Sequence, residues 1–437
     1  MSNYLDWQNK ISPDRKIVPL FHVANYRISP VDKIVKDNED KVRLCNYMDV
    51  YKNTYITSDL DFMKGSATEN EIEKFLIQRG DVLITKDSES WNDIGIPAIV
   101  SGDFENITVC GYHLALLRPK TDLITPKFLY YSFESKEHRL QLEIEATGVT
   151  RFGIPKDAIG KYKLPLPSIS KQNKIVTFLD KEVMKIDLLI ENKTKLIALF
   201  EEKRKTIINQ SVTKGLDLNT AMKDSGIEWL GEIPNCWNLE RLKFLTKKIG
   251  SGVTPLGGAN IYTDTGILFL RSQNIYNDGL RLNDETFIPE DIHKEMRSSQ
   301  VQKGDLLLNI TGGSIGRCYY FNLDIEANIN QHVCIIRVNK KILYRYLHFV
   351  IISLVGQYQI DLLQYGGGRE AISFENIKNF SISFPQSIES QKEIVKFLDK
   401  ECLRFDKITN KIKTTIDLLK EKRTAIISAA INGEIEI

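Results

Sequence analysis

Two loops in the second half of the chain carry side chains suited to reading the edges of nucleic-acid bases. The first, LFLRSQNIYNDG (268–279), places Arg271, Ser272, Gln273 and Asn274 in succession. Arginine can donate two hydrogen bonds to guanine, and asparagine or glutamine can bond adenine in the same bidentate way. An ordinary solvated loop has a similar composition, so these residues are candidates rather than an established site.

The second loop, NITGGSIGR (309–317), combines small residues with a basic one. Its composition leaves backbone N–H groups open to a close approach by phosphate oxygen. We therefore take Thr311, Ser314 and Arg317 as further candidates. A tight turn without a ligand is the alternative interpretation of the same glycines.

Corresponding segments in the first half of the chain have different side chains. They are LCNYMDVYKNTY (44–55) and TKDSESWND (85–93). The candidate DNA-contacting residues from these segments, together with two arginines that match each other further along the chain, are Asn46, Tyr47, Lys52, Lys86, Ser88, Arg151 and Arg369.

The sequence offers little for catalysis. It has no GxxxxGK[ST] phosphate loop, no HExxH zinc motif and no Asn-Pro-Pro-aromatic tetrapeptide. Pro13-Asp14-Arg15-Lys16 superficially resembles a nuclease motif, but it lies in a polar segment without a matching strand. The six cysteines include no CxxC pair, which indicates reduced, mostly buried thiols. We expect no catalytic residue, no metal ligand and no bound cofactor in this chain.

An internal duplication organises the elements around these loops. The segment beginning QNKIVTFLDKE (172–182) matches QKEIVKFLDKE (391–401) when shifted by 219 residues. Over residues 172–208 the two copies agree at 16 of 37 positions. Weaker matches upstream pair RGDVLI (79–84) with KGDLLL (303–308), so the repeating unit covers about half of the chain.

Each copy changes character along its length. Short apolar runs broken by Gly, Pro, Asn and Asp predict strands and turns in its first part. Residues 171–212 and 389–431 contain neither Pro nor Gly and place apolar residues every three or four positions. This spacing predicts two long helices, each with one apolar stripe. Because one stripe needs a partner, we expect the two helices to pack together, antiparallel.

The predicted fold class is α+β, with two β-rich domains in a pseudo-twofold tandem repeat, separated by two long helices packed as an antiparallel coiled coil. About 40 helical residues would form a rod of about 60 Å, longer than the 34–36 Å of one DNA turn. The expected boundaries are a first recognition domain at 1–167, a first helix at 168–215, a linker at 216–237, a second recognition domain at 238–385 and a second helix at 386–437.

Composition is ordinary for a globular protein. Hydrophobic residues make up 42% and charged residues 27%, with a net charge of +2. Any field that attracts nucleic acid must therefore be local. No apolar run approaches the roughly 18–20 residues that span a bilayer, and the N-terminal segment has no signal-peptide pattern. We expect a cytoplasmic protein without membrane contact.

These features resemble the DNA-specificity (S) subunit of type I restriction-modification systems. The resemblance is carried by GIEWLGEIPNCW (226–237), SGVTPLGGANIY (251–262), KGDLLLNITGGSIGR (303–317) and the two helical segments. It covers nearly the whole chain. The first copy departs from the pattern, since GEIPxxW has no counterpart before Val18 and KDSESWNDIG replaces the glycine loop.

The resemblance implies a division of labour. Each β-rich domain would read one half of a split, asymmetric site in double-stranded DNA. The helices would set the spacer and dock two methyltransferase (M) subunits, with Phe178, Leu179, Phe397 and Leu398 as candidate docking residues. Those subunits would use S-adenosylmethionine to methylate adenine at N6, and restriction (R) subunits would add cleavage that depends on ATP and Mg.

Two other functions fit the same sequence. One is a specificity subunit for a fused restriction-methylation enzyme that cuts on both sides of its site. The other is a coiled-coil scaffold with two protein-binding lobes. Salt-dependent DNA binding would separate the scaffold from the two DNA-reading functions.

Overall fold

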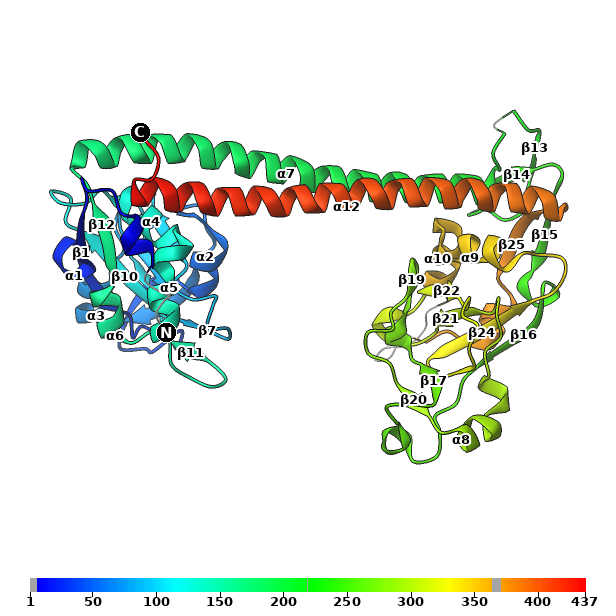
Figure 1. Cartoon of the computed structure of the whole chain (residues 1–437). Helices are drawn as coiled ribbons and strands as arrows, with labels where there is room; N and C mark the ends of the chain where they lie inside the picture. Colours follow the sequence, from blue (N-terminus) through cyan, green and yellow to red (C-terminus); the bar gives the residue numbers. More distant parts are fainter. Residues whose placement is uncertain (1–5, 218, 364–370) are drawn as a thin grey trace. The chain divides into compact units, whose positions relative to one another are not determined.

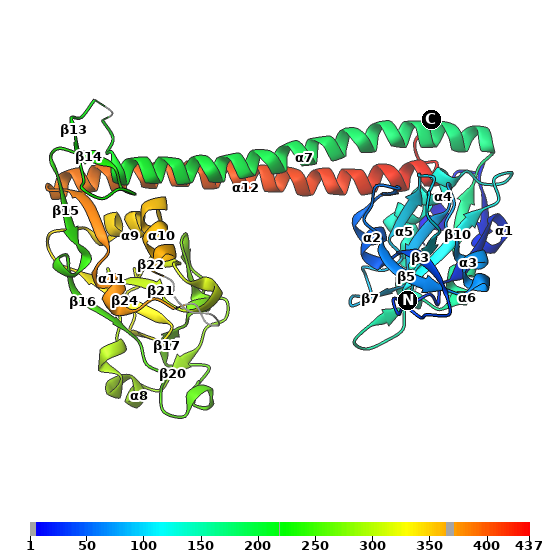
Figure 2. The same cartoon turned by 180° about the vertical axis from the view of Figure 1, so that it is seen from behind.

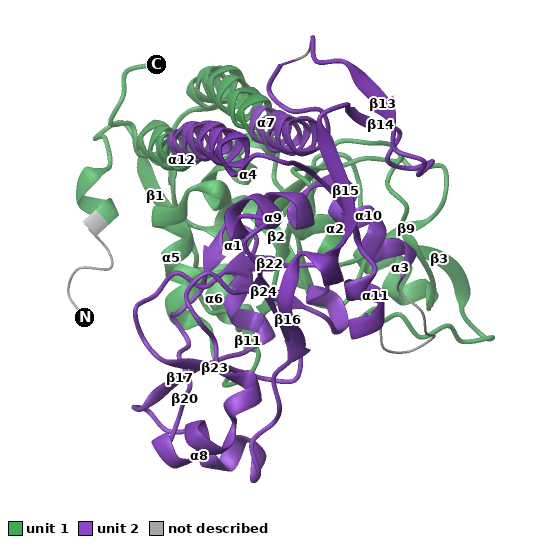
Figure 3. Cartoon of the chain, turned by 90° about the vertical axis from the view of Figure 1, so that its right-hand side faces the viewer, with its two compact units in different colours: residues 1–194, 413–437 green, residues 195–412 purple. Residues whose placement is uncertain are grey.

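The chain forms two compact units in its computed structural model, which describes residues 6–217, 219–363 and 371–437. Unit 1 comprises residues 1–194 and 413–437, and unit 2 comprises residues 195–412 (Figure 3). Two helices of 45 residues, α7 (Ile169–Thr213) and α12 (Ile388–Asn432), each contribute one part to either unit (Figure 1). Each unit thus contains one β-rich domain and a segment of both long helices.

The domain of unit 1 is built around two sheets. The first has the strand order β2-β10-β6-β8-β4 and the second the order β5-β3-β9. Two strand pairs, β1-β12 and β7-β11, complete it. The strands are β1 (Lys16–Pro19), β2 (Ala24–Ile28), β3 (Asp40–Cys45), β4 (Tyr55–Ile56), β5 (Met63–Ala67), β6 (Val82–Thr85), β7 (Asp87–Ser88), β8 (Pro97–Val100), β9 (Thr108–Cys110), β10 (Leu114–Pro119), β11 (Phe152–Gly153) and β12 (Lys163–Leu166). The helices are α1 (Leu20–Val23), α2 (Tyr47–Lys52), α3 (Glu69–Phe75), α4 (Pro126–Glu134), α5 (Lys136–Glu145) and α6 (Lys156–Lys161).

The domain of unit 2 has a comparable plan. A four-stranded sheet has the order β16-β24-β21-β22, and a three-stranded sheet has the order β20-β17-β23. The strands are β13 (Met222–Asp224), β14 (Glu232–Pro234), β15 (Trp237–Arg241), β16 (Thr246–Ser251), β17 (Ile267–Leu270), β18 (Ile275–Tyr276), β19 (Gly279–Leu280), β20 (Phe287–Ile288), β21 (Leu306–Asn309), β22 (Cys318–Tyr320), β23 (Ala327–Ile329), β24 (Val333–Val338) and β25 (Ser381–Pro385). The helices are α8 (Glu290–Glu295), α9 (Tyr344–Ile352), α10 (Leu354–Leu362) and α11 (Phe374–Lys378).

The continuous apolar runs of the sequence become strands that are covered on both faces. In β21, Leu306 and Leu308 enter the core beneath the long helices, whereas Leu307 enters a second core on the other face. In β6, Val82 and Leu83 divide between two cores in the same way. Alternation of side chains along a strand explains why every residue of these runs is apolar.

Each core is completed by both long helices. In unit 1, Ile175 near the start of α7 and Ile427 near the end of α12 share one core. In unit 2 the roles are exchanged, and Ile394 of α12 packs with Ile208 of α7. These two pairs are related by the 219-residue shift of the repeat. The predicted tandem repeat with two long paired helices is therefore confirmed.

Ion pairs between the helices give their direction. Asp187 of α7 lies 2.9 Å from Arg423 of α12 in unit 1, and Arg204 of α7 lies 2.6 Å from Asp406 of α12 in unit 2. The residue numbers rise along one helix as they fall along the other, so the packing is antiparallel, as predicted. The view from behind shows the two ribbons side by side (Figure 2).

A glutamine at the start of each long helix ties it to its own domain. The Gln172 side chain accepts a hydrogen bond from the Thr125 backbone N–H at 2.8 Å and donates to the carbonyls of Leu123 and Pro167. The Gln391 side chain makes the same three bonds, to Leu343, Lys341 and Pro385. Each glutamine thus satisfies three backbone groups beside a buried helix terminus.

The end of α12 is capped by a residue from the other end of the chain. The buried Arg15 guanidinium donates hydrogen bonds to the carbonyls of Ala430 and Ile431. Asp14 pairs with Lys171 at 2.8 Å. The Pro13–Lys16 segment therefore has a structural task, since terminal helix carbonyls have no partner within the helix. Gly215 and Gly433 follow the two long helices with positive φ, as a helix stop requires.

Among the residues that the structure describes, no helix is both long and apolar enough to span a bilayer.

Candidate nucleic-acid interface

In unit 1, three segments that are distant in sequence meet at one hollow. A cavity of about 520 Å³ is lined by Tyr47 at the start of α2, Ser88 of β7 and Arg151 in the loop before β11. The third segment is brought in by pairing of β11 with β7, in which Phe152 lies opposite Ser88. Three of the sequence-predicted candidates are therefore neighbours.

Aromatic and acidic side chains shape this hollow. Tyr47 and Tyr51 are stacked, with ring centroids 5.5 Å apart. The Tyr51 hydroxyl donates to Asp93 at 2.7 Å. Burial raises the pKa of Tyr47 above its usual value, so its hydroxyl stays protonated near neutral pH. The hollow thus offers ring faces and hydroxyl groups with fixed positions.

The other candidate residues of unit 1 do not line this hollow. The Asn46 backbone N–H is bonded to the Asp49 carboxylate at 2.7 Å at the start of α2. Lys86 is paired with Asp87, and its ammonium lies 6.0 Å from the Tyr112 ring centroid. Lys52 is exposed at the end of α2 and does not line the hollow.

A histidine supports the loop in each unit. His113 Nδ1 lies 2.6 Å from an Asp87 carboxylate oxygen, and His332 Nδ1 lies 2.6 Å from the Thr311 hydroxyl. The two histidines occupy matching positions at the start of β10 and β24. Both side chains are hydrogen-bonded to a residue of the neighbouring loop.

In unit 2 the predicted loops also converge. The buried Asn309 amide donates to the Ser272 carbonyl at 2.8 Å and to the Ser314 hydroxyl at 3.1 Å. Thr311 forms an antiparallel bridge with Ala371. The loops at 271–274, 311–317 and 371 are thus joined. Arg369 lies outside the described residues.

Arg317 is the cation of these unit 2 loops that is most available to bind a ligand. Its guanidinium carbon lies 4.5 Å from the centroid of the Tyr276 ring, and that of Arg281 lies 4.9 Å from the same centroid. Arg281 is also bound by both carboxylate oxygens of Asp278. Among the described residues Arg317 has no carboxylate within ion-pair distance, so the ring holds a guanidinium whose donors remain open.

Three other candidates are already engaged. The Asp284 carboxylate accepts from Arg271 at 3.1 Å and from Gln273 at 2.6 Å. Asn274 is buried, and its amide bonds the Arg271 N–H and the Arg281 carbonyl. The expectation that Asn274 reads a base is therefore wrong in this structure, because its polar atoms stabilise the turn. Sequence reasoning missed Asp284 and Tyr276, which only the folded loop brings into contact.

The run Gly312–Gly316 also fits the G-x-S-x-G pattern of hydrolase nucleophiles. That pattern requires a strand, a sharp turn and an α-helix. Here the serine lies in a short 3-10 turn (Gly312–Ser314), and its hydroxyl accepts from Asn309. His332 bonds Thr311 instead of Ser314. The described contacts give Ser314 no base to activate it.

The four predicted docking residues on the long helices differ in exposure. Leu179 and Leu398 are fully buried, so they belong to the domain cores and offer no surface to a partner. Phe178 is partly buried, and Phe397 is 38% exposed. The expectation for the two leucines is therefore wrong, because the apolar stripe faces inward.

Other apolar residues lie on the outer surface of the helices. Met184 and Leu403 are 66% and 61% exposed, and Leu199 and Leu418 are 60% and 59% exposed. Both pairs are related by the 219-residue shift. Apolar residues that recur outside the stripe in both copies were the signal that the sequence offered for them.

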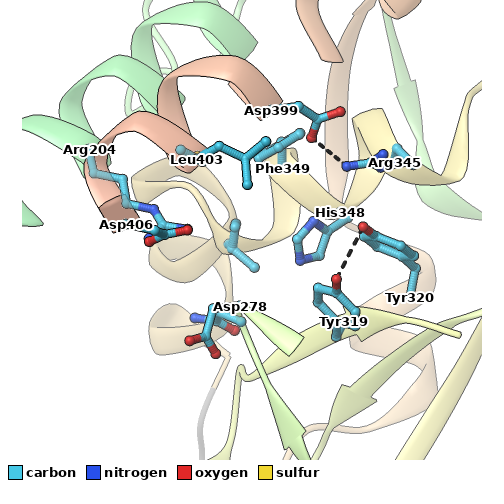
Figure 4. A pocket seen from close by; sticks show the side chains of 13 residues that line it. Arg204, Asp278, Tyr319, Tyr320, Arg345, His348, Phe349, Asp399, Leu403 and Asp406 are labelled. Atoms are coloured by element: carbon cyan, nitrogen blue, oxygen red, sulfur yellow. Dashed lines mark hydrogen bonds and ion pairs between the residues drawn. The ribbon is translucent and has the colours of Figure 1, made fainter. Parts of the chain in front are cut away.

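A cavity of about 280 Å³ lies between α9 and the two helices in unit 2 (Figure 4). Arg345 pairs with Asp399 on one side, and Arg204 pairs with Asp406 on another. Between them lies His348, whose Nε2 is 3.1 Å from the Cys318 carbonyl oxygen. Burial lowers the pKa of His348 to about 4, which keeps its ring neutral.

Comparison with known proteins gives a consistent result. The model of the type I restriction modification DNA specificity domain matches residues 25–198 and again 240–418. A Methanocaldococcus jannaschii protein, provisionally named the MjaX specificity subunit of a type I restriction enzyme, is 26% identical over 92% of this chain and 89% of its own. The type I restriction enzyme EcoBI specificity subunit of Escherichia coli is 24% identical over 77% and 72%.

A solved structure shares the fold. It was determined to explain complex assembly and conformational transition of the type I R-M system. One of its chains matches 97% of this chain and 99% of its own with a TM-score of 0.72, at 16% identity.

Proposed function

Because the chain belongs to the type I restriction modification DNA specificity domain family, we propose that each of its units reads one half of a split, asymmetric site in double-stranded DNA. The observation that carries the proposal is the double match, once in each copy of the repeat. A chain with two domains of one fold but different loops can recognise two different sequences.

The loops of the two units support different specificities. The hollow of unit 1 combines Tyr47, Ser88 and Arg151, whereas unit 2 presents Arg317 on the ring of Tyr276. An open guanidinium can bond guanine O6 and N7, or a phosphate oxygen. The scaffold beneath the loops is the same in both units, since each has the strand-to-helix glutamine and the loop-supporting histidine.

The chain itself would be non-catalytic. Methylation of adenine at N6, after the base leaves the stack, would be the task of two methyltransferase subunits that carry S-adenosylmethionine. Cleavage driven by ATP and Mg would belong to restriction subunits. The outward-facing pairs Met184 with Leu403 and Leu199 with Leu418 support two docking surfaces related by the repeat. A fused restriction-methylation partner would use the same DNA-reading units, and the identity of co-purifying proteins would separate the two systems.

The test is a genome-wide map of methylated adenines in cells with and without this chain. We expect a bipartite motif, with two short specified parts and a fixed gap, to be methylated only when the chain is present. Arg317→Ala, produced at the same level, should reduce methylation of that motif. An unchanged methylation map after removal of the chain would contradict the proposal, as would DNA binding that does not weaken with salt.

The long helices provide a second test, of spacer length. Asp187 and Arg204 on α7 are as far apart in sequence as Asp406 and Arg423 on α12. A four-residue insertion between the first two residues needs a matching insertion between the second two, because otherwise one ion pair loses its register. The double insertion should lengthen the gap of the methylated motif. An unchanged gap in a stable double insertion would contradict a spacer role.

A further inference from the structure

The loop between α5 and β11 in unit 1 is a short, closed finger. The backbones of Thr147 and Gly153 exchange two hydrogen bonds, of 3.0 and 2.8 Å. Gly148 has φ +142°, and a Cβ there would lie 1.9 Å from the Arg151 carbonyl oxygen. The finger therefore needs glycine at this position, and its two ends are held together by the two backbone hydrogen bonds.

The base of the finger is anchored to the domain. Gly153 pairs with Asp87 across β11 and β7, and the Ile154 N–H donates to the Lys86 carbonyl at 2.9 Å. Ile154 itself lies in the core. The finger thus extends from the same corner that carries Lys86 and Ser88, and its own Arg151 lines the hollow there.

The tip of the finger is apolar. Val149 is 92% exposed, more than any other large hydrophobic side chain that the structure describes. A single exposed apolar residue is not unusual in itself. Its position matters here, because it stands at the end of an anchored finger, two residues before an exposed arginine of the candidate interface.

Base edges in the major groove of DNA display one apolar group, the C5 methyl of thymine. A two-stranded ribbon fits into this groove, which is about 12 Å wide. We propose that the finger, residues 147–153, enters the major groove and that Val149 contacts a thymine methyl group in the half-site read by unit 1. This inference rests on the proposed function, since it names one base contact of that reading.

The probe is a set of duplexes that carry the mapped site, in which each thymine in turn is replaced by uracil. Uracil keeps the base pair and removes only the methyl group. With the full chain in the complex that co-purifies with it, we expect one thymine at which uracil weakens binding about threefold to fivefold, the effect of one buried methyl group.

Val149→Ser should bind the thymine duplex more weakly than the wild type and show no penalty for uracil at that position. Because the side chain is almost fully exposed, this variant should fold normally. Leu256→Ser, at a residue of unit 2 that is 89% exposed, is the matched control and should keep the full penalty.

Two results would overturn the inference: a wild-type complex indifferent to uracil at every position, or a Val149→Ser complex that keeps the penalty. A wild-type complex with no preference for any site is a different result, and it would overturn the proposed function itself.

Discussion

One arginine position of the repeat is used differently in the two units. In unit 1, Arg423 of α12 binds Glu134 of α4 and Asp187 of α7, and its side chain is 20% exposed. In unit 2 the equivalent Arg204 has Asp406 as its one carboxylate partner among the described residues, because Ile352 at the end of α9 replaces the glutamate. The cavity of unit 2 lies beside this simpler pair.

The difference shows which contacts the scaffold requires. Burial acts to lower the pKa of Arg423, but the two carboxylates outweigh it and raise the pKa. The helix-to-helix pair recurs in both units, whereas among the described residues no second carboxylate pairs with Arg204 as Glu134 does with Arg423. The ion pair between the helices is thus common to both copies, whereas the additional glutamate is particular to unit 1.

The largest effect that we predict concerns this arginine. Arg423→Ala should destabilise unit 1 by about 3–5 kcal/mol, because it leaves Glu134, whose side chain is only 17% exposed, without its partner. Arg204→Ala should cost unit 2 only about 1 kcal/mol, because Asp406 is half exposed. Hydrogen exchange in α4 and α9, monitored as urea unfolds the protein, would measure the loss of stability in each unit. Equal losses would contradict the comparison.

A double substitution sharpens the same comparison. In a Glu134→Ile background, unit 1 acquires the arrangement of unit 2, and Arg423→Ala should then cost about as little as Arg204→Ala. Persistence of the large cost would show that Glu134 is not its source.

The next effect should be equal in the two units. Gln172→Ala and Gln391→Ala each remove three backbone hydrogen bonds, with a loss of about 2–3 kcal/mol at about 1 kcal/mol per bond. Hydrogen exchange at Thr125 and Leu343, whose N–H groups lose their acceptor, would report the change. A loss in one unit alone would show that the two anchors are not equivalent.

A smaller effect should separate two arginines of unit 2 in DNA binding. Arg317→Ala should weaken binding by about 1–3 kcal/mol if the guanidinium reaches a base. Arg271→Ala should cost less, because Asp284 already holds that side chain. Competition binding at fixed salt would measure the DNA affinity of both variants. Arg317→Ala should alter the discrimination between bases in one half-site only. A larger loss for Arg271→Ala would reverse the assignment.

The smallest effect concerns acid stability. Burial lowers the pKa of His138 in unit 1 and of His348 in unit 2 to about 4. The two histidines do not occupy equivalent positions of the repeat. The unfolded chain takes up these protons first, so stability is complete above pH 6.5 and falls as pH drops towards 4. The cost should be about 1 kcal/mol per histidine at pH 5.5. Between pH 7 and 5, the free energy of unfolding of His138→Gln and His348→Gln, measured by urea titration, should fall less than that of the wild type. An unchanged dependence of this free energy on pH would contradict the prediction.

The repeat and its helices could be predicted because their signals are local or periodic. Sixteen matching residues, a stripe every three to four positions and the lack of Pro and Gly define α7 and α12 without any tertiary contact. Which loop residues are free could not be predicted in the same way. The Asn274 amide, expected to contact a base, donates to the Arg281 carbonyl instead, and the Gln273 amide donates to the Asp284 carboxylate. Such contacts depend on how a loop closes, which residue types alone do not specify.

The central claim, that the two units read DNA independently, is tested most directly by a chimera. Residues 1–165 would be replaced by those of a relative, with Ser135 and His138 retained because they bond Ser428 and Asn432 of α12. The methylated motif of the chimera would then be mapped. We predict that one half of the motif changes while the other half and the gap stay the same. A change in both halves would contradict the account.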